Sequence, residues 1–299
     1  MKILYVGHKD PRDYLQELIF HGLYKLFGAD VVDANKIWWM YEDYDPSKQS
    51  KDGSGACVAF QNKFSPLGSL KDIADRSNIE EKIKDRFYDF IVYGSCNKSI
   101  DFLEEVREAY PPDKIAFIDG SDNQIFHIHG EPEVDPSNLF FKRELCSLNR
   151  AFPVSFCIPE ESIVKDTEDI EKEKLVAEVV PFRPETYVFQ NEEEYFKDYQ
   201  QSFFGVTTKK AGWDCYRHYE ILANYCIPYF RGIENCPEHT LFSFPKKKIK
   251  ESNKIWEGVL SGKNFNREQY KEHLEYLYKY TKENLTTTSM ANYITEKIA

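Results

Sequence analysis

The sequence lacks several patterns that would point to common classes of protein. Its seven cysteines are scattered, and no two of them form a C-x-x-C pair. A structural zinc site needs clustered ligands, so the cysteines predict no such site. No apolar run approaches the length of a membrane-spanning helix or of a signal-peptide core. We therefore expect a soluble, cytoplasmic protein with no transmembrane segment.

Positive charge is also in short supply. The 299 residues carry 39 Lys and Arg against 50 Asp and Glu, which gives a formal net charge of −11. Such an excess repels phosphate backbones, so nucleic acid binding would need a strong local basic face. The dense basic run at 246–250 is too short to reverse that repulsion. The sequence therefore predicts no nucleic acid partner.

The glycine-rich fingerprint of dinucleotide-binding proteins is missing after the first apolar run. Gly7-His8-Lys9-Asp10-Pro11 stands there instead, and it cannot make the turn that G-x-G-x-x-G makes. This argues against a dinucleotide-dependent dehydrogenase. Disorder is excluded as well, because 41% of the residues are hydrophobic and the chain is long enough to bury a core.

What is present is an alternation of short apolar runs with helical patterns, which is typical of a parallel sheet with crossover helices. The first half predicts strands and helices with a long polar loop at 41–69 and a less regular middle around 140–156. The predicted strands are 2–7, 29–34, 88–94 and 114–118, and the predicted helices are 13–27, 78–87 and 100–110.

A charged run at 165–174 is the best candidate for a linker. Beyond it the alternation resumes, with predicted strands at 176–180, 202–207 and 227–231 and predicted helices at 192–201, 212–226, 252–261, 268–281 and 289–298. We expect an α/β fold of two Rossmann-like lobes, the second one small. The expected parts are 1–160, 175–285 and a last helix within 286–299.

Ligands of parallel sheets bind beyond the carboxyl ends of the strands, so the residues that follow the strands are candidates for the site. In the first lobe these are His8, Asp119 and Asp122. In the second, the predicted strand end at 207–212 leads into a helix N-terminus beside Lys209 and Lys210, which predicts a phosphate site.

Arg217 and Glu220 are three residues apart and share a face of the predicted helix. A carboxylate beside a phosphate site can bind ribose hydroxyls. The alternative is an ordinary surface ion pair.

The segment from about 195 to 250 resembles the donor-binding lobe of GT-B glycosyltransferases, closest to the CgeB-like and group-one branch. That pattern runs Ser, strand, Gly-Trp-Asp, Arg-x-x-Glu-x-Leu-Ala, a small turn, Ile-Pro. The matching residues are Ser202, Gly212, Trp213, Asp214, Arg217, Glu220, Leu222, Ala223, Ile227 and Pro228. Upstream, 119–122 and 140–145 resemble the end of the family's first lobe.

The resemblance implies a function. The two lobes would face each other across a cleft, and the last helix would cross back onto the first lobe. The protein would transfer a sugar from a nucleotide-sugar donor, UDP- or GDP-linked, to a carbohydrate or other hydroxyl acceptor, with no required cofactor or metal. Glu220 would hold the donor ribose, and Arg217, with Lys209, Lys210 and Gly212, would lie near the diphosphate.

Retaining relatives carry a second glutamate eight positions before the ribose glutamate, where this chain has Gly212. We therefore expect inversion, with a general base from the first lobe. His8 is the first candidate, with Asp119 as its partner; Asp122, His127 and His129 are rivals. Alternatively, His8 caps a loop and Asp119 forms an Asp-Gly turn.

Two questions stay open at this stage. A non-catalytic sugar- or nucleotide-binding protein and a GT-B-like sugar-nucleotide epimerase would share the same lobes, and fold alone does not decide between them. Four aromatic residues beside the polar loop could stack on a sugar, or they could be core packing. These are Trp38, Trp39, Tyr41 and Tyr44.

Overall fold

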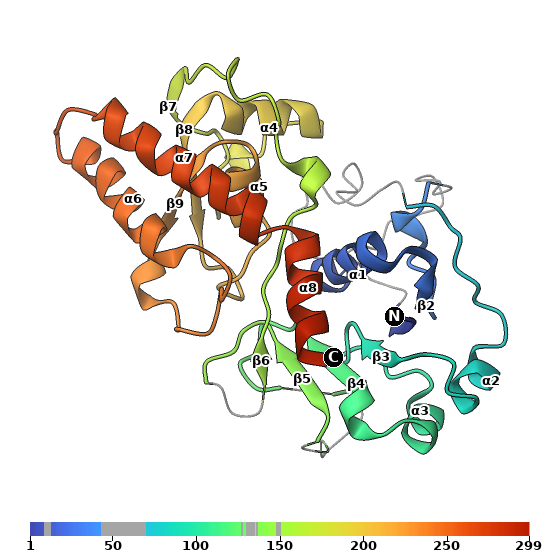
Figure 1. Cartoon of the computed structure of the whole chain (residues 1–299). Helices are drawn as coiled ribbons and strands as arrows, with labels where there is room; N and C mark the ends of the chain where they lie inside the picture. The colour runs from blue at the N-terminus through green and yellow to red at the C-terminus, as the bar shows by residue number, and fades with distance from the viewer. Residues whose placement is uncertain are drawn as a thin grey trace.

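The computed structural model describes residues 1–8, 13–42, 70–126, 128–129, 135, 137–147 and 151–298. Two α/β lobes are visible in it, each built around a parallel sheet (Figure 1). The first sheet has six strands and the second has three, which confirms an α/β fold with a small second lobe. Among the described residues we find no helix with the length and apolarity needed to span a bilayer.

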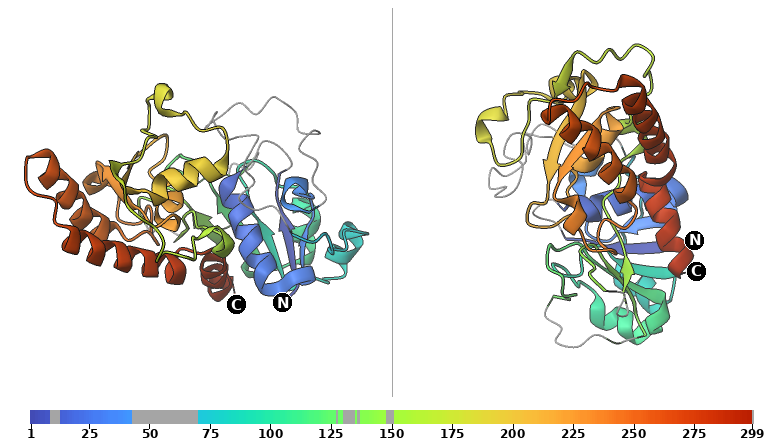
Figure 2. Two further views of the ribbon diagram at one scale, coloured as in Figure 1. Left: turned by 90° about the horizontal axis from the view of Figure 1, so that it is seen from above. Right: turned by 90° about the vertical axis from the view of Figure 1, so that its left-hand side faces the viewer.

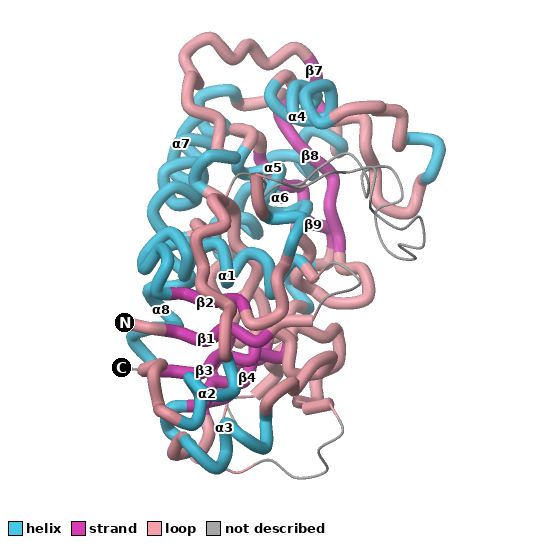
Figure 3. The backbone as a smooth tube through the Cα atoms, turned by 90° about the vertical axis from the view of Figure 1, so that its right-hand side faces the viewer, coloured by secondary structure: helices cyan, strands magenta, loops and turns pink. Residues whose placement is uncertain are grey.

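The first-lobe sheet has the strand order β2-β1-β3-β4-β5-β6, and every neighbouring pair is parallel. Figure 3 shows β2, β1, β3 and β4 side by side in that order. The strands are β1 (Ile3–Val6), β2 (Val31–Asp33), β3 (Phe90–Tyr93), β4 (Ile115–Asp119), β5 (Leu139–Lys142) and β6 (Phe152–Pro153). Because β5 and β6 lie within the middle that we expected to be irregular, that expectation is wrong.

Helices cover both faces of this sheet, which explains why β1 is apolar at every position. Ile3 and Tyr5 face the core under α1 (Tyr14–Phe27), whereas Leu4 and Val6 face the core under α2 (Ile79–Lys84) and α3 (Leu103–Ala109). The first of these helices begins where the sequence predicts, because Asp13 accepts a hydrogen bond from the Gln16 amide as its N-cap.

The second lobe is built on the order β7-β8-β9, from β7 (Lys174–Val176), β8 (Ser202–Thr208) and β9 (Ile227–Arg231). Its helices are α4 (Glu192–Gln200), α5 (Arg217–Ala223), α6 (Lys246–Leu260) and α7 (Arg267–Asn284). Two expectations are wrong here. The first strand ends at Val176 instead of beginning there, and the helix predicted at 212–226 is confined to 217–223.

The last helix, α8 (Thr287–Ile298), packs along α1 of the first lobe (Figure 1). Met290, Ala291 and Ile294 belong to the same core as β1. The two helices approach so closely that a Cβ on Gly22 would lie 2.1 Å from the Thr287 carbonyl oxygen. Both ends of the described chain therefore lie close together on the first lobe, as both views in Figure 2 show.

Two segments connect the lobes and run side by side where they cross. The Ile158 amide donates to the Leu285 carbonyl oxygen (2.8 Å), and the Thr287 amide donates to the Ile158 carbonyl oxygen (3.0 Å). Glu160 then caps α8 by accepting from the Thr288 amide (3.2 Å). The two connecting segments are therefore hydrogen-bonded to each other through their backbones where they cross.

Candidate active site

His8 follows β1 at the carboxyl edge of the first-lobe sheet, and it is 6% exposed. Gln16 of α1 fixes its backbone: the His8 amide donates to Gln16 Oε1 (2.8 Å), and Gln16 Nε2 donates to the His8 carbonyl oxygen (3.2 Å). A Cβ at Gly7 would lie 2.8 Å from the same Oε1, so the glycine permits this contact. The strand end and the helix together hold the imidazole in place.

Asp13 and Lys98 lie beside that imidazole. His8 Nε2 is 3.7 Å from Asp13 Oδ2 and 3.3 Å from Lys98 Nζ. The same Oδ2 accepts from Lys98 (2.8 Å) and from the Ser95 hydroxyl (2.9 Å). Burial alone would raise the pKa of Asp13, but the neighbouring His8 and the hydrogen bond and charge of Lys98 hold it well below its usual range. An ionised carboxylate beside a histidine is an arrangement that orients a general base.

Asp119, the predicted partner of His8, ends β4 with no exposed surface. Its Oδ2 lies 3.1 Å from Lys142 Nζ on the neighbouring strand, and its Oδ1 accepts from the Ser121 amide (2.8 Å). Lys142 is equally buried; burial lowers its pKa and the charge of Asp119 opposes that effect. Asp119 therefore forms a buried ion pair with Lys142, and Asp13 is a carboxylate that lies beside the His8 ring.

Asp122 lies where the two lobes meet, and its side chain is about half exposed (49%). Arg143 binds it: Nη2 donates to Asp122 Oδ1, while Nη1 donates to the Asp214 carbonyl oxygen of the second lobe (2.5 Å). The guanidinium Nε donates to the Gly120 carbonyl oxygen (2.9 Å). Asp122 is thus tied to an arginine that joins the lobes.

Gly212 faces the same junction. Glu144 of the first lobe accepts from the amides of Trp213 (3.1 Å) and Asp214 (2.9 Å). A Cβ on Gly212 would lie 2.6 Å from both Asp122 Oδ1 and Glu144 Oε1. A glutamate here would meet two other carboxylates, so the close approach of the lobes itself favours glycine.

Lys209, Lys210 and Gly212 lie in a loop rather than at a helix N-terminus. β8 ends at Thr208 and α5 begins only at Arg217. The Lys210 amide donates to the Gly212 carbonyl oxygen (3.0 Å), which closes a turn. The prediction that these lysines flank the first turn of a helix is therefore wrong, although both remain beside the second-lobe strand end.

Asp214 explains why the helix starts late. Its Oδ2 accepts from the Phe156 amide (2.7 Å) and its Oδ1 from the Tyr219 hydroxyl (3.0 Å), so it anchors the loop to other elements. Burial raises the pKa of Asp214 to about 7, against the opposing charge of Arg143.

His218 fixes the loop from the other side and is fully buried. Its Nε2 lies 2.9 Å from the Trp213 carbonyl oxygen and its Nδ1 2.9 Å from the Thr207 hydroxyl. A carbonyl oxygen only accepts, so Nε2 carries the proton and Nδ1 accepts from the hydroxyl. Burial lowers the pKa of His218 to about 3, which keeps the ring neutral.

Arg217 and Glu220 lie one turn apart on α5, as their spacing predicts. Arg217 is 5% exposed, and its Nη1 donates to the Tyr187 hydroxyl (3.2 Å). Glu220 is half-buried, and its Oε2 accepts from the Tyr195 hydroxyl (3.1 Å). Burial raises the pKa of Glu220, whereas the charge of Arg217 lowers it.

Glu192, the first residue of α4, adds a second carboxylate to this group. Burial raises its pKa to about 7, and the charge of Glu220 acts in the same direction. Near neutral pH it can therefore donate a hydrogen bond as well as accept one, which suits the binding of hydroxyl groups.

A ring stack joins the two groups of polar residues. Tyr14 follows Asp13 in the first lobe and Tyr216 precedes Arg217 in the second, and their rings stack with centres 5.3 Å apart and planes at 7°. The His8 group and the Glu220 group thus approach one another at the lobe junction.

The remaining predicted candidates add little to the site. His127 and Tyr44 lie outside the described residues, and the His129 amide donates to the Cys96 carbonyl oxygen (2.8 Å). Trp39 and Tyr41 are buried in the first-lobe core, so a sugar-stacking platform that includes them is wrong. In the described ranges, no group of three or more His, Cys, Asp or Glu side chains could hold a metal ion.

No protein-family model and no curated protein matches this chain. Among solved structures, the chain is similar to an alpha-glucosyltransferase in complex with UDP and a 13-mer DNA containing a HMU base. The TM-score is 0.49 at 10% identity, over 99% of each chain. At this identity and TM-score the similarity describes the course of the chain and says nothing of residues or ligands.

Proposed function

We propose that the protein is a glycosyltransferase that moves a sugar from a nucleotide-sugar donor on the second lobe to a hydroxyl acceptor at the first. The observation that carries the proposal is the meeting of two unlike polar groups. One is an imidazole beside an ionised carboxylate, and the other is Arg217 with Glu220, whose charge in turn acts on Glu192. The first suits proton removal, and the second suits a diphosphate with its neighbouring sugar hydroxyls.

On the donor side, Glu220 accepts hydrogen bonds from the ribose hydroxyls and Arg217 pairs with the diphosphate. The charge of Lys210 also reaches Glu220, since it lowers the pKa of that carboxyl. Lys210 and Lys209 therefore supply further positive charge for the phosphates. UDP- or GDP-sugars are the proposed donors.

On the acceptor side, His8 takes the proton of the attacking hydroxyl. Asp13 stabilises the imidazolium that forms, and Lys98 holds Asp13 ionised in the resting state. The acceptor oxygen attacks the anomeric carbon while the bond from that carbon to the diphosphate oxygen breaks. The phosphate charge that develops is stabilised by the Arg217 group. A single displacement of this kind inverts the anomeric configuration.

The test of the donor site compares wild type with Glu220→Gln in titrations with UDP-, GDP-, CMP- and dTDP-sugars. A donor that binds the folded state raises the melting temperature, by an amount that follows its concentration over Kd. We expect one donor class to stabilise wild type and to bind Glu220→Gln at least about tenfold more weakly. The assignment would fail if the variant bound that donor as tightly as wild type.

The proposed acceptor is a carbohydrate, because the net charge of −11 disfavours nucleic acid. Product analysis should therefore show transfer to an oligosaccharide and none to a hydroxyl-bearing DNA duplex supplied at the same concentration. Transfer to the duplex alone would overturn this part of the proposal and leave the donor site standing.

A further inference from the structure

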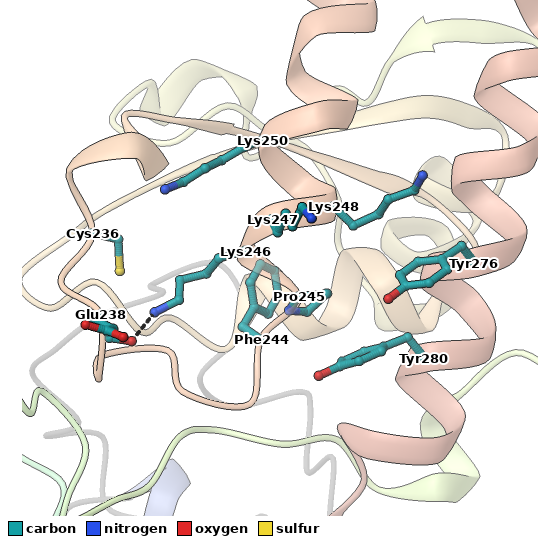
Figure 4. A pocket seen from close by; sticks show the side chains of 10 residues that line it. All are labelled: Cys236, Glu238, Phe244, Pro245, Lys246, Lys247, Lys248, Lys250, Tyr276 and Tyr280. Atoms are coloured by element: carbon teal, nitrogen blue, oxygen red, sulfur yellow. Dashed lines mark hydrogen bonds between the residues drawn. The ribbon is translucent and has the colours of Figure 1, made fainter.

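A pocket of about 620 Å³ opens at the start of α6. Its walls come from the loop after β9, the first turn of α6 and one face of α7 (Figure 4). None of its lining residues belongs to the His8 group or to the Glu220 group. The basic run that seemed too short to matter in the sequence lies here.

The first residues of α6 carry positive charge, which is the unfavourable sign at the N-terminal end of a helix. Lys246, Lys247, Lys248 and Lys250 all fall within the first five residues of α6, and the first turn contains no acidic residue. The N-terminal end of a helix carries positive partial charge and favours anions. Four cations at that end therefore repel the helix dipole and one another, and an anion bound there would relieve the repulsion.

The four lysines differ in the contacts that they make. Lys246 has a structural role. Its Nζ donates to the carbonyl oxygens of Pro237 (3.1 Å) and Thr240 (2.6 Å) and so holds the loop between β9 and α6. Figure 4 shows it pointing to Glu238. Lys248 lies 3.6 Å from Glu251. Lys247 and Lys250 are exposed, and neither forms an ion pair with any described residue.

Two tyrosines of α7 complete the pocket. Tyr276 and Tyr280 are one turn apart, and their rings lie nearly parallel with centres 6.1 Å apart. The Tyr280 hydroxyl donates to the Ser243 carbonyl oxygen (3.0 Å), which fixes its ring, whereas Tyr276 is 50% exposed. Lys248 Nζ lies over the Tyr276 ring, 5.4 Å from its centre, and the exposed part of the ring provides a surface on which a flat ring stacks while its phosphates reach the lysines.

We propose that this pocket is a second ligand site, separate from the Glu220 group, and that it takes a free mononucleotide with two or more phosphates. Lys247 and Lys250 pair with the phosphates, and Tyr276 stacks on the base. The volume suits one such molecule. The proposal is independent of glycosyl transfer, since it needs neither His8 nor Glu220.

The experiment uses the full chain carrying both Arg217→Gln and Glu220→Gln, which removes the proposed diphosphate and ribose contacts of the donor site. Inorganic pyrophosphate and ADP are the probes, measured by calorimetry and by the protection of individual lysines from acetylation, read by mass spectrometry. We expect both probes to protect Lys247 and Lys250. The double variant Lys247→Gln/Lys250→Gln should weaken both probes at least about tenfold. The control Lys254→Gln/Lys271→Gln removes the same amount of charge from exposed positions, one on α6 and one on α7. It should change the affinity for either probe very little.

Tyr276→Leu separates the ring from the phosphates. ADP should bind this variant roughly fivefold to a hundredfold more weakly, whereas pyrophosphate should bind as before. Three outcomes would overturn the proposal. The control pair could weaken binding as much as the pocket pair does. Protection of the lysines could require an intact Glu220. A single-stranded DNA of about eight nucleotides could bind far more tightly than ADP, which would replace a free nucleotide by a strand.

Discussion

The charge of His218 is decided by its burial. Its pKa in the folded protein is about 3, against an ordinary value of 6.5, so between these values the unfolded chain binds a proton that the folded chain does not. This contribution to stability is complete above pH 6.5 and is lost as the pH falls toward 3. The loss is on the order of 5 kcal/mol.

His218→Gln tests this contribution, because glutamine keeps a donor for the Trp213 carbonyl oxygen and does not titrate. Urea unfolding at a series of pH values should give a free energy of unfolding that depends less steeply on pH in the variant than in wild type between pH 6.5 and 3. Identical slopes in the two proteins would mean that His218 protonates freely in the folded state.

His8 and Asp13 are expected to matter for rate. His8→Ala should lower turnover by about two to four orders of magnitude, the usual effect of losing a general base. Asp13→Asn keeps an N-cap residue on α1 but removes the negative charge that Lys98 binds, so it should lower the turnover per folded molecule and also lower the melting temperature. Turnover and melting temperature are to be measured on the same preparations.

Asp119→Asn is the contrasting case. It leaves Lys142 buried without its carboxylate, which should lower stability by about 3 kcal/mol. Turnover per folded molecule should stay near that of wild type. A large fall in turnover at unchanged stability would instead restore Asp119 as part of the catalytic group.

At the scale of elements, the loop between β8 and α5 decides how the lobes fit. Gly212→Ala would place a Cβ 2.6 Å from two carboxylate oxygens. We expect a loss of about 1–3 kcal/mol in stability and weaker donor binding, because the loop must move away from the first lobe. Gly258→Ala on α6 is the matched control: its Cβ would meet the nearest side chain at 3.5 Å, an ordinary contact, and should cost nothing. Equal effects of the two changes would show that the loop can shift freely.

The elements that the sequence predicts well carry their signal locally. α1 combines the Asp13 cap with apolar residues at helical spacing, and β1 is a short apolar run between a lysine and a glycine. β5 was missed because Lys142 and Arg143 break its apolar run. Their partners, Asp119, Asp122 and Asp214, are distant in the sequence, so the pairing that buries these charges has no local sign.

The same distinction holds for the candidate site. Arg217 and Glu220 could be recognised because they share one helix. Lys98 could not be joined to His8 and Asp13, since a polar turn gives no hint that it meets an N-cap residue 85 positions earlier in the chain. Glu192 stands in a run of three glutamates that resembles an ordinary helix start.

At the scale of the whole molecule, we propose that residues 286–299 belong to the first lobe in stability, although they follow the second lobe in sequence. Because Ile294 is fully buried in the first-lobe core, Ile294→Ala should cost about 2–5 kcal/mol. Hydrogen exchange should then accelerate first in α1 and β1. Faster exchange confined to α6 and α7 would contradict this division.

The packing of α8 on α1 also has a consequence for synthesis on the ribosome. His21 and Thr287 touch although 266 residues separate them, and the helix that contains Thr287 supplies part of the core of the first lobe. Domains usually fold in order from the N-terminus as translation proceeds at about 5–20 residues per second. Here the first lobe is made well before α8, so for several seconds or more the apolar surface that α8 covers stays exposed. That interval is when a nascent chain of this protein is most open to chaperones and proteases, and a pause in translation before α8 would lengthen it.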